Sequence, residues 1–262
     1  MTVGGRARAA VLAGTALLAL SGGPAVTPAL PVPAVSTISA TRQAGGSGTS
    51  PEPLPAAVDW RSGHAVTPVQ DKGQCDEIAG RAYATAAVLE GAWVVQSRRR
   101  LTSFTPVITD ASGEDVFPRL CGEPRPPGTS EFPVEAFQRW VPVASGDEDA
   151  LRAAVARGPV RARIDTSQVS FALYSAGVYD EPLCSSARPD HSIAVVGYGT
   201  TPAGVEYWIV KNDYGARWGE EGFALMSRDR DNQCGIATEA EEAVLNPAPY
   251  TAPFRNPWPV FP

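Results

Sequence analysis

The side chains best suited to covalent or metal chemistry are four cysteines and two histidines. Cysteine can act as a thiolate nucleophile, bind zinc or form disulfides, and histidine can act as a general base or a metal ligand. No pair of cysteines has the Cys-x-x-Cys spacing of a zinc site, and His64 and His191 are far apart. We therefore expect no metal and no other cofactor, and we expect His64 to lie in a surface loop. The cysteines are Cys75, Cys121, Cys184 and Cys234.

The N-terminal segment predicts export. Arg6 and Arg8 precede an apolar run over residues 9–20, and small residues follow it. A spanning helix needs roughly 20 apolar residues, so this run is too short, whereas its order of features is typical of a secretory signal peptide. An amphipathic anchor is the alternative, but the run has no charged face. We expect a signal peptide over residues 1–23, a secreted (extracellular) protein, and no membrane anchor.

Export changes what the cysteines imply. In an oxidising compartment, an even number of cysteines favours two disulfides, and the sequence alone allows three pairings of the four. The formal net charge of −6 and the pI of about 5.1 argue against a surface that binds nucleic acid or anionic membranes. A hydrophobic content of 44% over 262 residues is enough for a buried core.

Composition divides the chain into four segments. After the signal peptide, residues 24–53 are rich in Pro, Gly and Ser and predict a leader without a packed core. Residues 54–245 predict one globular domain. Residues 246–262 interleave prolines with aromatic residues, so this tail packs along the domain surface or serves as a docking strip for a partner.

Hydrophobic periodicity predicts helices followed by strands. Apolar residues recur at intervals of three and four over residues 80–96, which predicts a helix, and residues 147–156 predict a shorter one. Alternating and β-branched patterns punctuated by Gly, Pro and Asn predict the strands. We expect an α+β arrangement of two lobes with a cleft between them. The predicted strands are 160–164, 192–198, 206–211 and 222–226.

Five stretches match one family in the same order along residues 54–244. Together they resemble the papain-like cysteine peptidases of the papain and cathepsin type. The resemblance implies the papain-like two-lobe fold, with a helical N-terminal lobe, an antiparallel β-barrel-like C-terminal lobe and a cleft between the lobes. The matching stretches are Val58–Arg61 with Ala65–Val69, Phe171–Tyr174 with Gly177–Tyr179, Asp190–Gly199, Lys211–Gly215, and Trp218–Phe223.

The nucleophile of this family has no counterpart here. The family chemistry needs a thiolate at the start of the central helix, beside an imidazole that an amide orients. Counting back from Glu90 and Gly91 at the far end of the helix places Gly80 at the nucleophile position. Counting forward from Cys75 without a gap places Ile78 there instead. Neither residue has a nucleophilic side chain, so the thiol is missing under both alignments.

The resemblance also implies the disulfide pairing. It pairs Cys75 with Cys121, which begins the run Cys121-Gly-Glu-Pro124, and it pairs Cys184 with Cys234. All four thiols are then consumed. Cys75 also lies five residues before the nucleophile position, so it would act only as a reduced and displaced nucleophile.

Other positions of the family site are altered. The oxyanion-hole glutamine corresponds to Lys72 or, if the two extra residues before the helix are allowed for, to Gln74. Pro124 replaces a glycine whose backbone N–H would pair with substrate, and proline has none to donate. Tyr214 replaces the tryptophan beside the asparagine.

The imidazole and the amide of the family are retained as His191 and Asn212. They are either a preserved catalytic pair or hydrogen-bonding groups kept in the core between strands. Asp76 and Glu77 suit a helix N-terminus, where the macrodipole favours carboxylates. We hypothesise that one of these two carboxylates occupies the place of the thiolate and pairs with His191.

These features predict a catalytically inactive, monomeric protein that binds a peptide or protein ligand in the remnant cleft. The first alternative is an active cysteine-type peptidase that hydrolyses peptide bonds with Cys75. A hydrolase in which His191 activates a water, with Asp76 or Glu77 as its partner, belongs to the same competing class. A further alternative is a structural protein that uses the fold only as a stable block.

Overall fold

The computed structural model describes residues 53–75, 77–107 and 128–247. The chain divides into two units, Met1–Ser50 and Pro51–Pro262, and all described residues belong to the second. The predicted signal peptide, almost all of the leader, and nearly the whole tail therefore lie outside the described residues, as do Asp76, Cys121 and Pro124.

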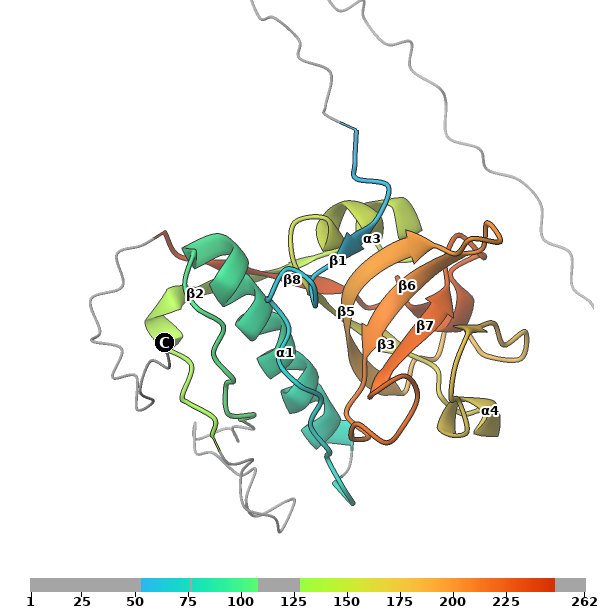
Figure 1. Cartoon of the computed structure of the whole chain (residues 1–262), viewed down its shortest axis with the longest axis horizontal. Helices are drawn as coiled ribbons and strands as arrows, with labels where there is room; N and C mark the ends of the chain where they lie inside the picture. Colours follow the sequence, from blue (N-terminus) through green and yellow to red (C-terminus); the bar gives the residue numbers. More distant parts are fainter. Residues whose placement is uncertain (1–52, 76, 108–127, 248–262) are drawn as a thin grey trace, which may run out of the picture. The chain divides into compact units, whose positions relative to one another are not determined.

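A long helix and one large sheet dominate the described part (Figure 1). The sheet order is β2-β8-β3-β5-β6-β7-β4, with β1 paired to β5. The helices are α1 (Glu77–Ser97), α3 (Glu148–Val155) and α4 (Val169–Ala172), with short 3-10 turns at Val134–Ala136 and Gln233–Gly235. The strands are β1 (Val58–Asp59), β2 (Phe137–Pro142), β3 (Val160–Ile164), β4 (Val178–Tyr179), β5 (His191–Thr200), β6 (Glu206–Lys211), β7 (Phe223–Ser227) and β8 (Glu241–Leu245).

The long helix α1 is built for close packing. Its sequence is rich in alanine, the strongest helix former, and small side chains let it approach the sheet. At Gly91 a Cβ atom would clash with the ring of Pro159, so the absence of a side chain there permits contact with the turn before β3. The helix packs on β5, β8 and β3 (Figure 1). It begins three residues before the predicted start at 80.

Both faces of the sheet are covered because its central strands are apolar on both sides. Along β5, Ile193 and Val195 enter one core cluster, while Ala194 and Val196 enter the other. This alternation follows from the two-residue period of a strand. The first cluster also holds Leu151 of α3, and the second holds Trp93 of α1. The sheet thus forms a rigid wall against which α1 is fixed.

Every predicted element is observed, but four strands were not predicted and one strand pair is parallel. The bounds of β3 and β6 are those predicted, and α3 is capped by Asp147, which accepts a hydrogen bond from the Ala150 amide. The strands β1, β2, β4 and β8 were not predicted; β2 and β8 pair with each other at one edge of the sheet. The sheet is also not wholly antiparallel, because β4 and β7 pair in parallel.

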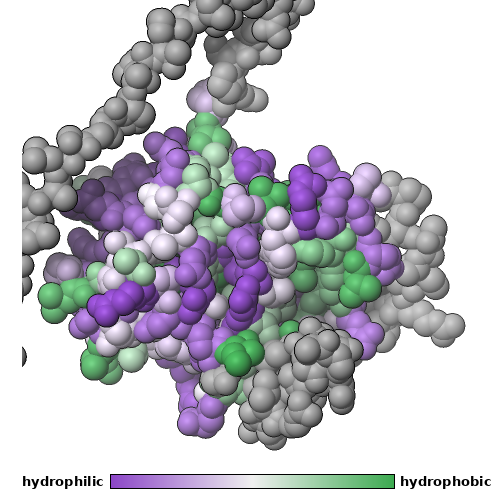
Figure 2. Space-filling model, turned by 180° about the vertical axis from the view of Figure 1, so that it is seen from behind, coloured by the Kyte–Doolittle hydropathy of each residue, from purple (hydrophilic) through white to green (hydrophobic). Residues whose placement is uncertain are grey.

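No helix among the described residues is long and apolar enough to cross a membrane. On the face seen in Figure 2, hydrophilic residues predominate, and hydrophobic ones occur singly or in small groups. Exposed hydrophobic side chains such as Val134, Val169 and Leu173 come from separate segments or a short helix.

Candidate functional site

The fold brings His191 and Asn212 together. His191 is the first residue of β5, and Asn212 follows the last residue of the antiparallel neighbour β6. The start of one strand therefore lies beside the end of the other, and Nε2 of His191 is 2.7 Å from Oδ1 of Asn212. Both side chains are buried. The pair has the imidazole–amide arrangement that the resemblance implied.

A carboxylate lies on the other side of the imidazole. Glu77, in the first turn of α1, places Oε2 2.8 Å from Nδ1 of His191. Its second oxygen accepts a hydrogen bond from the backbone amide of Ser192. The hypothesis that a carboxylate at the helix start pairs with His191 is confirmed for Glu77. The other candidate, Asp76, lies outside the described residues.

The charges in this pair support each other. Partial burial would raise the pKa of Glu77, but the hydrogen bond to His191 and the charges of His191 and Lys72 lower it below its ordinary value. Burial would lower the pKa of His191, but the bond to Glu77 and the charges of Asp213 and Glu77 raise it. Both ring nitrogens face oxygen atoms, and the raised pKa favours the protonated imidazolium form of His191.

Gly80 lies one helical turn after Glu77 and faces the same cluster. A Cβ atom on Gly80 would be 2.9 Å from Oδ2 of Asp213, 3.0 Å from Nζ of Lys72 and 3.1 Å from Oε2 of Glu77. Ile78, the other position considered for the nucleophile, has 55% of its surface exposed. Of the two alignments, the one that selects Gly80 therefore agrees with the geometry.

Lys72, not Gln74, belongs to the cluster. The backbone amide of Lys72 donates to the carbonyl of Asp213 at 2.8 Å, which fixes this segment beside the end of β6. Its Nζ is 3.2 Å from Oε2 of Glu77 and 3.6 Å from Oδ2 of Asp213. Gln74 is exposed. Lys72, one of the two residues that the resemblance places at the oxyanion-hole glutamine, is thus an ammonium already paired with two carboxylates.

Asp213 is a member of the cluster that sequence reasoning missed. It is buried, and neither of its oxygens has a hydrogen-bond partner among the described residues. Burial raises its pKa, although the charges of His191 and Lys72 oppose this. Its Oδ1 lies 3.6 Å from Nε2 of His191. The available signal was its position, a carboxylate directly after the retained asparagine.

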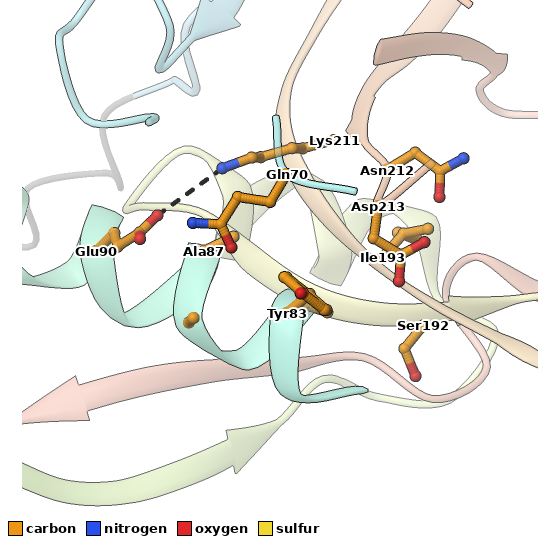
Figure 3. Close-up of a pocket in the computed structure, with 11 residues that line it drawn as sticks. Gln70, Tyr83, Ala87, Glu90, Ser192, Ile193, Lys211, Asn212 and Asp213 are labelled. Atoms are coloured by element: carbon orange, nitrogen blue, oxygen red, sulfur yellow. Dashed lines mark ion pairs between the residues drawn. The ribbon is translucent and has the colours of Figure 1, made fainter. Parts of the chain in front are cut away.

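A small cavity extends from Asn212 along α1 (Figure 3). It measures about 20 Å³, which is room for one water molecule. At its far end, Lys211 and Glu90 form a buried pair with Nζ and Oε2 3.8 Å apart. Burial raises the pKa of Glu90 and lowers that of Lys211, against the attraction of their charges. The cavity is too small for a peptide, so any ligand binds outside it.

Aromatic rings enclose the imidazole. Tyr214 has its ring centroid 5.1 Å from that of His191, and Trp218 lies 5.5 Å from Tyr214. Burial and neighbouring carboxylates raise the pKa of Tyr214 to about 12, so it stays neutral. The tyrosine therefore shields the ion cluster from water as an uncharged ring.

The cysteines carry no reactive thiol in the described part. Cys184 and Cys234 form the disulfide that the resemblance implied. Cys75 is also disulfide-bonded, and its expected partner Cys121 lies outside the described residues. No group of His, Cys, Asp and Glu in the described segments is arranged to hold a metal ion. His64 is exposed in a turn after β1.

Comparison with known proteins identifies the family. Residues 54–107 and 125–244 match the family described as papain family cysteine protease. A cathepsin L-like peptidase of Aedes aegypti is 35% identical over 213 residues, covering 71% of this chain and 62% of its own length. Silicatein of Petrosia ficiformis is 37% identical over 222 residues, covering 73% of this chain and 64% of its own length.

Solved structures agree with this match. The structure of digestive procathepsin L 3 from the larval midgut of Tenebrio molitor has a TM-score of 0.64 and 32% identity, covering 75% of this chain and 72% of that one. The chain spans about 62% of the length of its Aedes relative. Because the family match covers more than half of the chain and the fold agrees, the chain belongs to the papain family of cysteine proteases and has its α+β fold.

Proposed function

We propose that this papain-family protein is secreted, has lost peptidase activity and acts by binding a peptide or protein segment in its remnant cleft. The observation that carries the proposal is the contact between Glu77 and His191, 2.8 Å long, beside Gly80. Papain-type catalysis needs a thiolate at this place. Here Gly80, which has no side chain, faces three charged groups, and the carboxylate of Glu77 contacts the imidazole of His191.

The protonation of His191 also argues against a role as a general base. In the imidazolium form that the raised pKa favours, Nδ1 donates to Glu77 and Nε2 donates to Asn212. An imidazolium with both N–H groups engaged has no lone pair with which to take a proton from a thiol or a water. This argues against the alternative in which His191 activates a water with Glu77 as its partner.

The competing function, an active peptidase with Cys75 as nucleophile, needs a free thiol. Cys75 is disulfide-bonded, and it precedes the helix that should present the nucleophile. A disulfide sulfur is not a thiolate, so Cys75 would first have to be reduced.

Labelling with an electrophilic peptide probe for cysteine peptidases tests the proposal. We expect no adduct on the folded protein, and an intact mass four hydrogens below that of the reduced chain, one for each cysteine. A working papain-family enzyme, treated in parallel, controls for probe quality. A stoichiometric adduct at Cys75 would establish the competing function and overturn the proposal.

Secretion and the role of the tail need separate tests. N-terminal sequencing of protein exported by an expression host should show cleavage near residue 23, and retention of residues 1–23 would contradict export by a signal peptide. A pull-down with residues 246–262 deleted should keep the partner if the cleft binds it. Loss of every partner would place binding in the tail and leave the domain as a structural block.

A further inference from the structure

A second hollow adjoins the site on the other side of Ser192. It measures about 320 Å³, at the lower end of the range for small-molecule sites. Ser192 lines both this hollow and the small cavity beside Asn212, so the hollow opens next to the His191 cluster. Its walls come from α1, β3, the end of β2 and the segment that leads into β8. We call it the arginine pocket, because Arg81, Arg161 and Arg163 all line it.

Two of these arginines are already neutralised. Arg161 is buried, forms an ion pair with Glu241, donates to Oγ1 of Thr85 at 2.7 Å, and stacks 4.2 Å over the ring of Trp140. These contacts fix its guanidinium in one orientation. Arg163 pairs with Glu239 at 3.1 Å. Each carboxylate of the pocket, Glu239 and Glu241, is therefore already paired with one arginine.

Arg81 is the cation left over. It projects from α1 one residue after Gly80, is exposed, and has no ion pair or side-chain hydrogen bond within the described segments. The pKa of Arg161 is lowered chiefly by burial. The like charge of the nearby Arg81 lowers it further. Among the described residues that line the pocket, three guanidinium groups stand against two carboxylates, which leaves one uncompensated positive charge.

The pocket can accept a carboxylate at low cost. A guanidinium with a free edge binds a carboxylate through two parallel hydrogen bonds. The second contact comes from Arg163, whose pair with Glu239 is exposed, since the side chains keep 33% and 52% of their surface. Exposed pairs of this kind contribute little, so a ligand carboxylate can replace Glu239 without a large loss.

We propose that the arginine pocket binds the side-chain carboxylate of a glutamate or aspartate in the segment held by the cleft. This rests on the proposed peptide-binding function and narrows its ligand to acidic segments. Arg81 supplies the unpaired charge and Arg163 the second donor. A basic side chain would face three guanidinium groups and is rejected by the same charges.

NMR titration with three probes tests this: acetyl-Ala-Glu-Ala-amide, the Gln analogue and the Lys analogue. We expect the Glu probe to shift the side-chain Nε–Hε signals of Arg81 and Arg163 and to bind at least about tenfold more tightly than the Gln probe, as a charge-assisted pair allows. Arg81→Ala should remove this preference, and Arg81→Glu should transfer it to the Lys probe. Arg230→Ala, an exposed arginine outside the pocket, is the matched control and should change nothing.

The outcomes separate the two proposals. Equal binding of the Glu and Gln probes, or an unchanged preference in Arg81→Ala, overturns the acidic pocket but leaves peptide binding intact. Binding of no probe at millimolar concentration also overturns the acidic pocket. A random peptide library then decides whether the cleft binds peptides at all, and failure there overturns the proposed function itself.

Discussion

Helix α1 carries two carboxylates that meet cations of the sheet, and the two pairs behave in opposite ways. Glu90 is 2% exposed and faces Lys211 of β6, whereas the side chain of Glu77 is 33% exposed and faces His191 of β5. Burial moves Glu90 and Lys211 towards their neutral forms, while mutual contact keeps Glu77 and His191 charged. Hydrogen bonding and charge attraction outweigh burial for Glu77 and His191, whereas burial outweighs the mutual attraction of Glu90 and Lys211.

The hydrogen bonds around the two pairs explain their different roles. Glu90 accepts from Thr67 at 2.6 Å and from the amide of Phe104 at 2.8 Å, and Thr67 in turn accepts from Lys211 at 2.8 Å. These partners join α1 to the sheet and to two loops. Glu77 has fewer fixed partners and borders the arginine pocket through Ser192. The pair of Glu90 and Lys211 therefore stabilises the fold, whereas the pair of Glu77 and His191 lies in the candidate site.

The largest effect should come from breaking the deeper pair. Glu90→Ala removes the acceptor of Thr67 and of the Phe104 amide and leaves Lys211 buried without its partner, so we expect the free energy of unfolding to fall by about 3–5 kcal/mol. Urea denaturation with the disulfides intact measures it. Glu77→Ala, the matched variant on the same helix, should cost only about 1 kcal/mol. Equal losses in the two variants would remove the distinction between the pairs.

A second prediction concerns reactivity at Gly80. In Gly80→Cys the new thiol would lie among two carboxylates and the ammonium of Lys72, beside a His191 whose Nδ1 is already engaged by Glu77. We therefore expect the single variant to stay unlabelled by the peptide probe. The double variant Glu77→Gln/Gly80→Cys frees Nδ1 and should label at least about tenfold faster. Rapid labelling of the single variant would show that Glu77 does not block the site.

The pH dependence of stability gives a third prediction. Because the pKa of Glu77 is lower in the folded state, its ionised carboxylate stabilises the fold at pH values above the unfolded pKa of 4.5. This stabilisation is lost as the pH falls through the folded pKa. Because the pKa of His191 is higher in the folded state, its protonated form stabilises the fold at pH values below the unfolded pKa of 6.5. This stabilisation is lost as the pH rises through the folded pKa. The stability difference between wild type and Glu77→Gln should therefore be greatest between pH 4.5 and 6.5, at about 1 kcal/mol.

Denaturation series at several pH values, together with an NMR titration of His191, check this window. Glu77→Gln should also lower the pKa of His191, because it removes the hydrogen bond that chiefly raises it. A stability difference that is constant from pH 4 to pH 8 would contradict the assignment.

The smallest effect is expected at Asp213. Its raised pKa means that the fold disfavours the ionised carboxylate, a penalty that is present once pH exceeds the folded pKa. Asp213→Asn should therefore leave the stability at pH 7 unchanged or raise it by up to about 1 kcal/mol. Thermal unfolding compared at pH 4 and pH 7 measures this. A loss of stability at pH 7 would show that its attraction to His191 and Lys72 exceeds its burial cost.

Several strand bounds and the identity of the retained site residues could be predicted from local sequence. The strands 160–164 and 206–211 have the predicted bounds because each is a short β-branched run between turn residues. The absence of a cysteine at the helix start needed no structure, since neither Gly80 nor Ile78 carries a thiol. The retention of His191 and Asn212 also followed from motifs that lie within single strands or at their ends.

The tertiary structure alone decided which side chains meet. The two extra residues before α1 left open Gly80 or Ile78, Lys72 or Gln74, and Asp76 or Glu77, because spacing does not show which way a side chain points at an irregular helix start. Packing of α1 against the sheet selected Gly80 and Lys72, and it brought Glu77 into contact with His191. Asp213 and Arg81 gained their roles only from neighbours distant in sequence, since an electrostatic environment depends on distances that the fold sets.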